Sequence, residues 1–152
     1  MATPVPFDLT MARQAFATAA QLHGRATRIG TPNLAAEDFA ELRAADAAYI
    51  TALGEGRVAE AIDADDAFHD VLVRAADDPD VRVSVELLAP RLRRLDLWFF
   101  TRKMFDEPPS SHREIVEALE RGDAERAASL VEASFIRAGE TLAAALRRGD
   151  GR

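Results

Sequence analysis

The chain has 152 residues, of which 48% are hydrophobic, and its net charge is −7. The length fits a single domain with a sizeable core, and a negative chain without a continuous basic run disfavours a nucleic-acid-binding surface. It has no cysteine, which excludes disulfides and thiol catalysis. Neither a signal-peptide pattern nor a run of about 18 apolar residues is present, so we expect a cytoplasmic protein.

The composition favours an all-α fold, because Ala and Leu dominate the hydrophobic residues and the prolines cluster near predicted helix boundaries. Capping residues, glycines and prolines predict an antiparallel helical bundle of about six helices within one domain, 1–152. The predicted helices span about 8–23, 33–54, 57–76, 80–104, 111–121 and 124–148, and Gly24 or Gly30 helps to stop the first of them. Residues 1–7 and 149–152 are expected to be flexible.

The third predicted helix carries two polar residues in its apolar stripe. At helical spacing, Asp65 and His69 fall on one line with three apolar residues, Val58, Ile62 and Leu72. A buried carboxylate and a buried imidazole cost free energy unless they are hydrogen-bonded, paired or coordinated. The pattern therefore predicts partners for both side chains on other helices.

A second imidazole, His112, shares a face of the fifth predicted helix with Ile115, Val116 and Leu119 and should point inward. Two imidazoles and a carboxylate suit a divalent transition metal, and an i, i+4 pair supplies two of the ligands from one helix. In the plainer alternative, Asp65 accepts a hydrogen bond from His69 and a backbone carbonyl satisfies His112. We interpret His23, near the end of the first predicted helix, as structural or solvent-facing, since an imidazole there complements the helix dipole.

Pro90 interrupts the fourth predicted helix, so we expect a kink there. Further along the same helix, Leu97, Trp98, Phe99 and Phe100 form an apolar run that wraps around the helix. One core-facing stripe does not require so wide an apolar surface. We expect part of this run to contact a second copy of the chain in a homodimer.

Three motifs taken together resemble one known family. They are Asp65-x-x-Phe68-His69, the turn Ala75-Ala76-Asp77-Asp78-Pro79, and Ser111-His112-Arg113-Glu114-Ile115 followed by Ala118-Leu119-x-x-Gly122-Asp123 and Ala127. The combination is similar to the FCD domain, the effector-binding C-terminal half of the FadR subfamily of GntR transcription regulators, over almost the whole chain. Family regulators also carry an N-terminal winged-helix domain, which this sequence lacks. We therefore expect an excised domain or a free-standing sensor that does not bind an operator by itself.

The resemblance implies a metal site beside a pocket for a small carboxylate effector. Metal-binding members use an Asp and a His on one helix and two further His on later helices, and Asp65, His69 and His112 match three of these positions. The fourth position falls on Ser134, in a predicted inward line of Ala127, Val131, Ser134 and Ala138. A serine hydroxyl is a poor ligand for zinc or nickel. Two interpretations stay open: a three-ligand site completed by water or an effector oxygen, or a metal-free pocket. In either, the Ser134 hydroxyl is a candidate contact for the effector.

A carboxylate effector needs a cationic or hydroxyl group facing it. The fourth predicted helix supplies Arg91, Arg93 and Arg94, and arginine forms bidentate bonds to carboxylates. We select Arg94 first and Arg91 second, with a solvated or dimer-facing basic patch as the alternative. Tyr49 is a further candidate through its hydroxyl, against a purely core role.

The expected function is that of an effector-sensing and dimerisation domain of a GntR/FadR-type regulator, and not an enzyme. A small metal-dependent enzyme is the first rival, because two His and one carboxylate with open positions also suit oxygen or hydrolytic chemistry. The second rival is a dimerisation module without a ligand, in which the three polar residues form a buried network.

Overall fold

The computed structural model describes residues 9–101 and 112–150. These residues form six α-helices and one 3₁₀ turn, with no strand: α1 (Leu9–Gly30), η1 (Thr31–Asn33), α2 (Ala36–Gly54), α3 (Val58–Ala76), α4 (Pro79–Thr101), α5 (Arg113–Glu120) and α6 (Ala124–Asp150). The predicted all-α bundle of about six helices is confirmed. No helix in this part of the chain is both long and apolar enough to cross a membrane.

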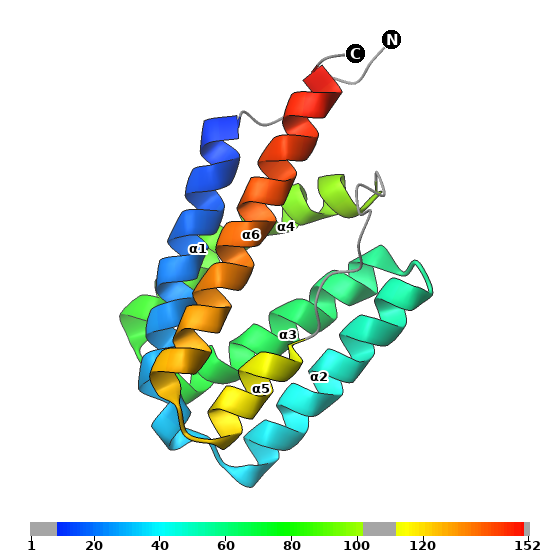
Figure 1. Cartoon of the computed structure of the whole chain (residues 1–152). Coiled ribbons are helices and arrows are strands. Elements are labelled where there is room, and N and C mark those ends of the chain that lie inside the picture. The colour runs from blue at the N-terminus through cyan, green and yellow to red at the C-terminus, as the bar shows by residue number, and fades with distance from the viewer. Residues whose placement is uncertain (1–8, 102–111, 151–152) are drawn as a thin grey trace.

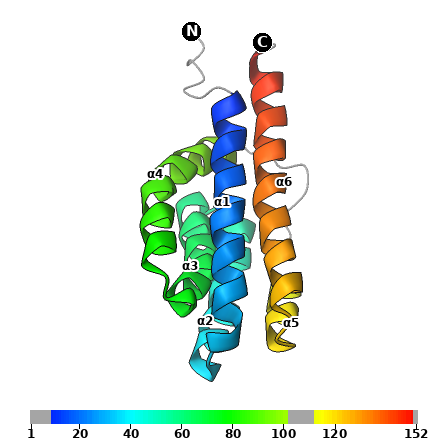
Figure 2. The ribbon, with the colours of Figure 1, turned by 90° about the vertical axis from the view of Figure 1, so that its left-hand side faces the viewer.

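The two longest stretches of contact join α1 to α6 and α2 to α3. Helices α1 and α6 run antiparallel along the length of the molecule, and α2 and α3 form a second antiparallel pair (Figure 1). The short helix α5 contacts both α2 and α6, whereas α4 packs on α1 and α3 (Figure 2). The start of α5 is thereby held close to both α2 and α3.

The core consists of several apolar clusters, of which two flank the polar residues of α3. One joins α2, α3, α5 and α6 around Leu42, Phe68 and Leu72. The other joins α1, α4 and α6 around Phe16 and Leu95. Phe135 of α6 packs against both clusters, so it marks the junction between them.

Short polar side chains and backbone turns set the helix boundaries. Asp78 accepts hydrogen bonds from the backbone N–H groups of Asp80 (3.0 Å) and Val81 (3.3 Å) at the start of α4. Helix α3 ends at Ala76, and the φ of the next residue, Asp77, is 50°, in the left-handed region. The predicted bounds of the third helix therefore agree with α3 to within one residue.

The predicted end of the first helix is wrong, because α1 continues through Gly24 to Gly30. A Cβ on Gly24 would lie 2.6 Å from Cγ of Glu132, and one on Gly30 would lie 2.8 Å from the carbonyl oxygen of Leu72. Both glycines are positions of close helix approach, and only Gly30 is also a stop. The continued helix places His23 mid-helix, away from any helix terminus.

Two smaller differences concern α4 and α6. Pro90 lies inside α4, and this helix changes direction along its length (Figure 2), consistent with the expected kink. Helix α6 extends to Asp150 and not only to residue 148. The predicted flexible segment 1–7 lies outside the described residues, as do the side chains of Phe99 and Phe100.

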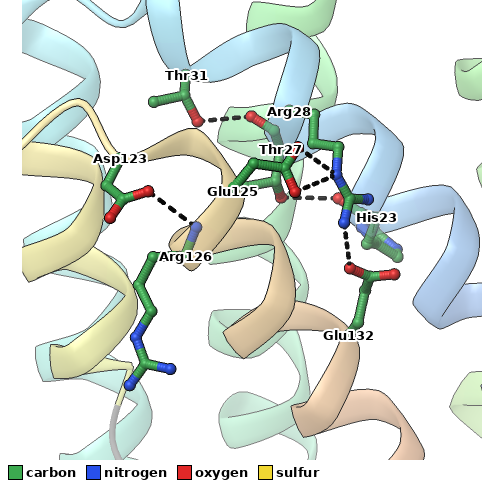
Figure 3. A network of polar contacts seen from close by, with 8 residues as sticks. All are labelled: His23, Thr27, Arg28, Thr31, Asp123, Glu125, Arg126 and Glu132. Carbon is green, nitrogen blue, oxygen red and sulfur yellow. Dashed lines mark hydrogen bonds and ion pairs between the residues drawn. The ribbon is translucent and has the colours of Figure 1, made fainter.

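An ion-pair cluster joins the C-terminal part of α1 to the N-terminal part of α6 (Figure 3). Nε of Arg28 donates to Glu125 at 3.0 Å and its Nη2 donates to Glu132 at 2.8 Å. These partly exposed pairs contribute only about 0–1 kcal/mol each, but they join residues that are about a hundred positions apart. They lie close to His23, whose carbonyl oxygen accepts a hydrogen bond from Thr27.

Candidate metal centre

The three predicted ligands meet where α3 faces the start of α5. Nε2 of His112 lies 2.7 Å from Oδ1 of Asp65, and Nε2 of His69 lies 3.5 Å from the same oxygen. One ligand atom from each residue lies within 4.8 Å of the others. The i, i+4 spacing places Asp65 and His69 together on α3, and the packing of α5 adds His112.

A fourth residue, Asp46 on α2, orients His112. Nδ1 of His112 lies 2.9 Å from Oδ1 of Asp46, and the backbone N–H of His112 donates to the same oxygen at 3.0 Å. Histidines that bind metals commonly donate their other ring N–H to a carboxylate, which fixes the tautomer and the ring orientation. The sequence analysis missed Asp46, although its i, i+3 spacing to Tyr49 was a usable signal.

The two members of the central hydrogen bond shift each other's protonation. Burial alone would raise the pKa of Asp65, but the charges and hydrogen bonds of His69 and His112 outweigh it and hold that pKa below its ordinary value. Burial alone would lower the pKa of His112, but its hydrogen bonds to Asp65 and Asp46 raise it above the ordinary value. In the metal-free protein, a protonated His112 donates its Nδ1–H to Asp46 and its Nε2–H to Asp65.

His69 is buried, and its Nδ1 has no hydrogen-bond partner among residues 9–101 and 112–150. An unsatisfied buried polar atom costs about 1–3 kcal/mol, so the side chain is not placed here by a complete hydrogen-bond network. Two imidazoles and a carboxylate within ligand distance are a donor set that zinc and nickel accept. On both counts these residues fit a divalent metal.

Aromatic rings enclose His112. Phe68 stacks on it with ring centroids 4.1 Å apart, and the ring of Tyr49 lies at 5.0 Å. Burial and the nearby carboxylates, Asp65 foremost, raise the pKa of Tyr49, so its hydroxyl keeps its proton. Tyr49 thus lies beside the candidate ligands, and its contact with an effector remains a prediction.

His23 is half-buried, and its ring contacts agree with the structural alternative of the two interpretations. Its ring stacks on Phe135 at a centroid distance of 4.7 Å and an interplanar angle of 11°, and it lies 5.4 Å from the ring of His69. Burial, with the His69 charge second, lowers the pKa of His23 to about 3. The helix-dipole reason for the interpretation is wrong, because α1 does not end at this residue.

Helix α6 presents Phe135 to the site, one residue after the position that the family pattern favours. The rings of Phe135 and His69 are 4.9 Å apart, whereas Ser134 is half-buried and Ala138 is exposed. The inward line predicted through Ser134 and Ala138 is therefore wrong at Ala138. The role of the Ser134 hydroxyl toward an effector remains a prediction.

The arginines of α4 do not lie together at the candidate metal centre. Arg91 and Arg94 are exposed, and Arg93 pairs with Asp63 at 2.7 Å. The polar residue of α4 that couples to Asp65 is Asp96, whose pKa is raised by burial and by the Asp65 charge. Effector binding by Arg91 and Arg94 stays a prediction, and the sequence analysis did not consider Asp96.

Comparisons with known proteins agree with the motif-based resemblance. The family model described as the FCD domain matches residues 14–137. A search of curated proteins found no match, and a search of solved structures found none either. The matched range includes every residue of the candidate centre.

Proposed function

The chain belongs to the FCD domain family, the regulatory effector-binding domains of GntR-type transcription regulators, and from this premise we propose that it senses a small organic acid through a divalent metal. Asp65, His69 and His112 would hold the metal, which is zinc or nickel. When bound, the metal supplies a Lewis-acidic anchor for an effector carboxylate. Binding would then shift the geometry of a homodimer and so an attached or associated DNA-binding domain.

The observation that carries the proposal is the convergence of the three ligand atoms within 4.8 Å, with Asp46 in place behind His112. Metal binding requires an unprotonated imidazole, so the proton that His112 shares with Asp65 has to leave. The affinity for metal should therefore rise with pH. Asp46 keeps the other ring nitrogen of His112 occupied throughout.

A dimerisation module without a ligand is the second candidate, since Asp65, His69 and His112 also form a polar network. The orphaned Nδ1 of His69 speaks against it, because a network selected only for stability would satisfy that atom. An enzyme is not proposed, because the family is regulatory.

The test is the metal content of the purified protein, measured by elemental analysis before and after chelation. Zinc and nickel are then titrated back in the presence and absence of small dicarboxylic acids, with the fluorescence of the half-buried Trp98 as the second signal. We expect one metal per chain, no metal in His69→Ala, and carboxylate binding that depends on metal. A wild-type protein that takes up neither metal would overturn the proposal.

A further inference from the structure

We propose that His23 of α1 is a fourth metal ligand, which replaces the imidazole that α6 lacks. The inference rests on the proposed metal site and adds a residue from a different helix. No residue pattern in α1 predicted it, because His23 enters the centre only through the packing of α1 on α3 and α6.

The spacing of the imidazole rings supports this assignment. The ring centroid of His69 lies 5.4 Å from that of His112 on one side and 5.4 Å from that of His23 on another. Zinc–nitrogen bonds of about 2.0–2.1 Å at a tetrahedral angle place two ring centroids roughly 5 Å apart. His23 is thus as close to His69 as the predicted ligand His112 is.

The ring nitrogens of His23 are available to bind a metal. No side-chain hydrogen bond occupies its ring nitrogens within the described part of the chain, and its only polar contact there is through the carbonyl oxygen. An imidazole nitrogen that makes no hydrogen bond can serve as a metal ligand. Next to it lies His69, whose buried Nδ1 has no hydrogen-bond partner among the described residues.

The His23 ring has to move before it can share a metal with the other three residues. The ligand atoms of Asp65, His69 and His112 already lie within 4.8 Å of one another, and His23 is outside that group. Its ring is held flat against Phe135, so it has to turn toward His69 when a metal binds. With His23 the metal would have four protein ligands, so an effector carboxylate would have to bind as a fifth ligand, a coordination number that zinc can reach.

The experiment compares wild type with His23→Phe, which keeps a ring against Phe135 but removes both nitrogens. Phe16→Leu is the control, because Phe16 also lies on α1 but belongs to the apolar cluster around Leu95, and the change removes no donor. Zinc affinity is measured by competition with a chromophoric chelator, and Co²⁺ substitution reports the ligand field through visible absorption. Circular dichroism confirms folding, and His23→Gln decides the matter if His23→Phe does not fold.

Zinc affinity should fall in His23→Phe by more than about tenfold, the lower end of what an outer-sphere hydrogen-bond partner contributes. The Co²⁺ spectrum should change as well, and Phe16→Leu should stay close to wild type in both. Equal affinity and an identical spectrum in wild type and His23→Phe would overturn the inference and leave the three-ligand proposal standing. A wild type that binds no metal would overturn both.

Discussion

At the scale of single residues, the centre is a chain of hydrogen-bonded groups whose order determines their protonation. His112 lies between the carboxylates of Asp46 and Asp65, at 2.9 and 2.7 Å. Each carboxylate accepts one ring N–H, so removing either one leaves a buried donor unsatisfied. The position of His112 is thus determined from both sides.

Asp46→Asn tests the orienting role of that side chain. The amide no longer favours a proton on Nδ1 of His112, so zinc affinity should fall by about 10–100-fold, the usual effect of losing such a partner. Competition with a chelator measures it. Glu37→Gln removes an equal charge from an exposed position of the same helix and should leave the affinity unchanged. Equal losses in the two variants would indicate a general charge effect.

The half-buried His23 predicts a pH dependence of stability in the metal-free protein. Folding lowers its pKa from 6.5 to about 3, so between these values the unfolded chain binds a proton that the folded chain does not. The free energy of unfolding therefore falls as the pH falls below 6.5. His112 has the opposite sign: its raised pKa gives a stabilisation that is present at low pH and is lost as the pH rises.

Comparison of wild type with His23→Phe isolates this contribution. From pH 7 to pH 5, with a chelator present, wild type should lose about 1 kcal/mol more than the variant, a value that allows for partial exposure of the ring. Urea denaturation at the two pH values measures both losses. Parallel losses in the two proteins would show that His23 titrates normally.

At the scale of elements, close backbone contact between α1 and α3 sets the position of both histidine-bearing helices. Gly30 lies against the backbone of α3, where a Cβ would be 2.8 Å from the Leu72 carbonyl oxygen and 3.1 Å from the Ala76 nitrogen. Backbone atoms cannot give way as a flexible side chain does. The spacing of these helices therefore depends on a residue without a side chain.

Gly30→Ala should lower the free energy of unfolding by about 1–3 kcal/mol, the usual cost of overpacking. Gly54→Ala is the matched control, because it lies at the end of α2 with nothing within 4 Å of an added Cβ. That change should be neutral or stabilising by up to about 1 kcal/mol, since alanine favours helix. Denaturant titrations of both variants provide the comparison, and equal stabilities would show that α1 can shift away from α3.

At the scale of the whole molecule, the described helices form one bundle with apolar side chains left on its surface. Leu87 and Val83 of α4 are 79% and 55% exposed, and they lie four residues apart. With the predicted apolar run further along the same helix, these side chains give α4 an apolar surface that the core of one chain does not cover.

We expect a homodimer in solution. Light scattering at micromolar concentration should give twice the 16.6 kDa mass of the chain. The same sample diluted stepwise, with and without zinc, shows whether metal binding alters the association. A mass equal to one chain across the whole range would contradict the expectation and leave the domain as a monomeric sensor.

The sequence by itself determined the helical bundle and half of the candidate centre. Helix periodicity and capping are local properties, so the bounds of α3 and the shared face of Asp65 and His69 followed from spacing alone. His112 followed from its shared face with Ile115, Val116 and Leu119, and the family resemblance, which the match to the FCD model confirms, grouped it with the other two. The same local reasoning failed for α1, because Gly24 signals a helix end as readily as a close contact.

Tertiary structure decided what surrounds those residues. Asp46 meets His112 across 66 residues of sequence, and His23 meets His69 and Phe135 only because α1 packs on both α3 and α6. Sequence spacing determines which side of a helix a residue occupies, but not which helix faces that side. The packing of buried apolar surfaces makes that choice, and it set the carboxylate behind His112 and the imidazole beside His69.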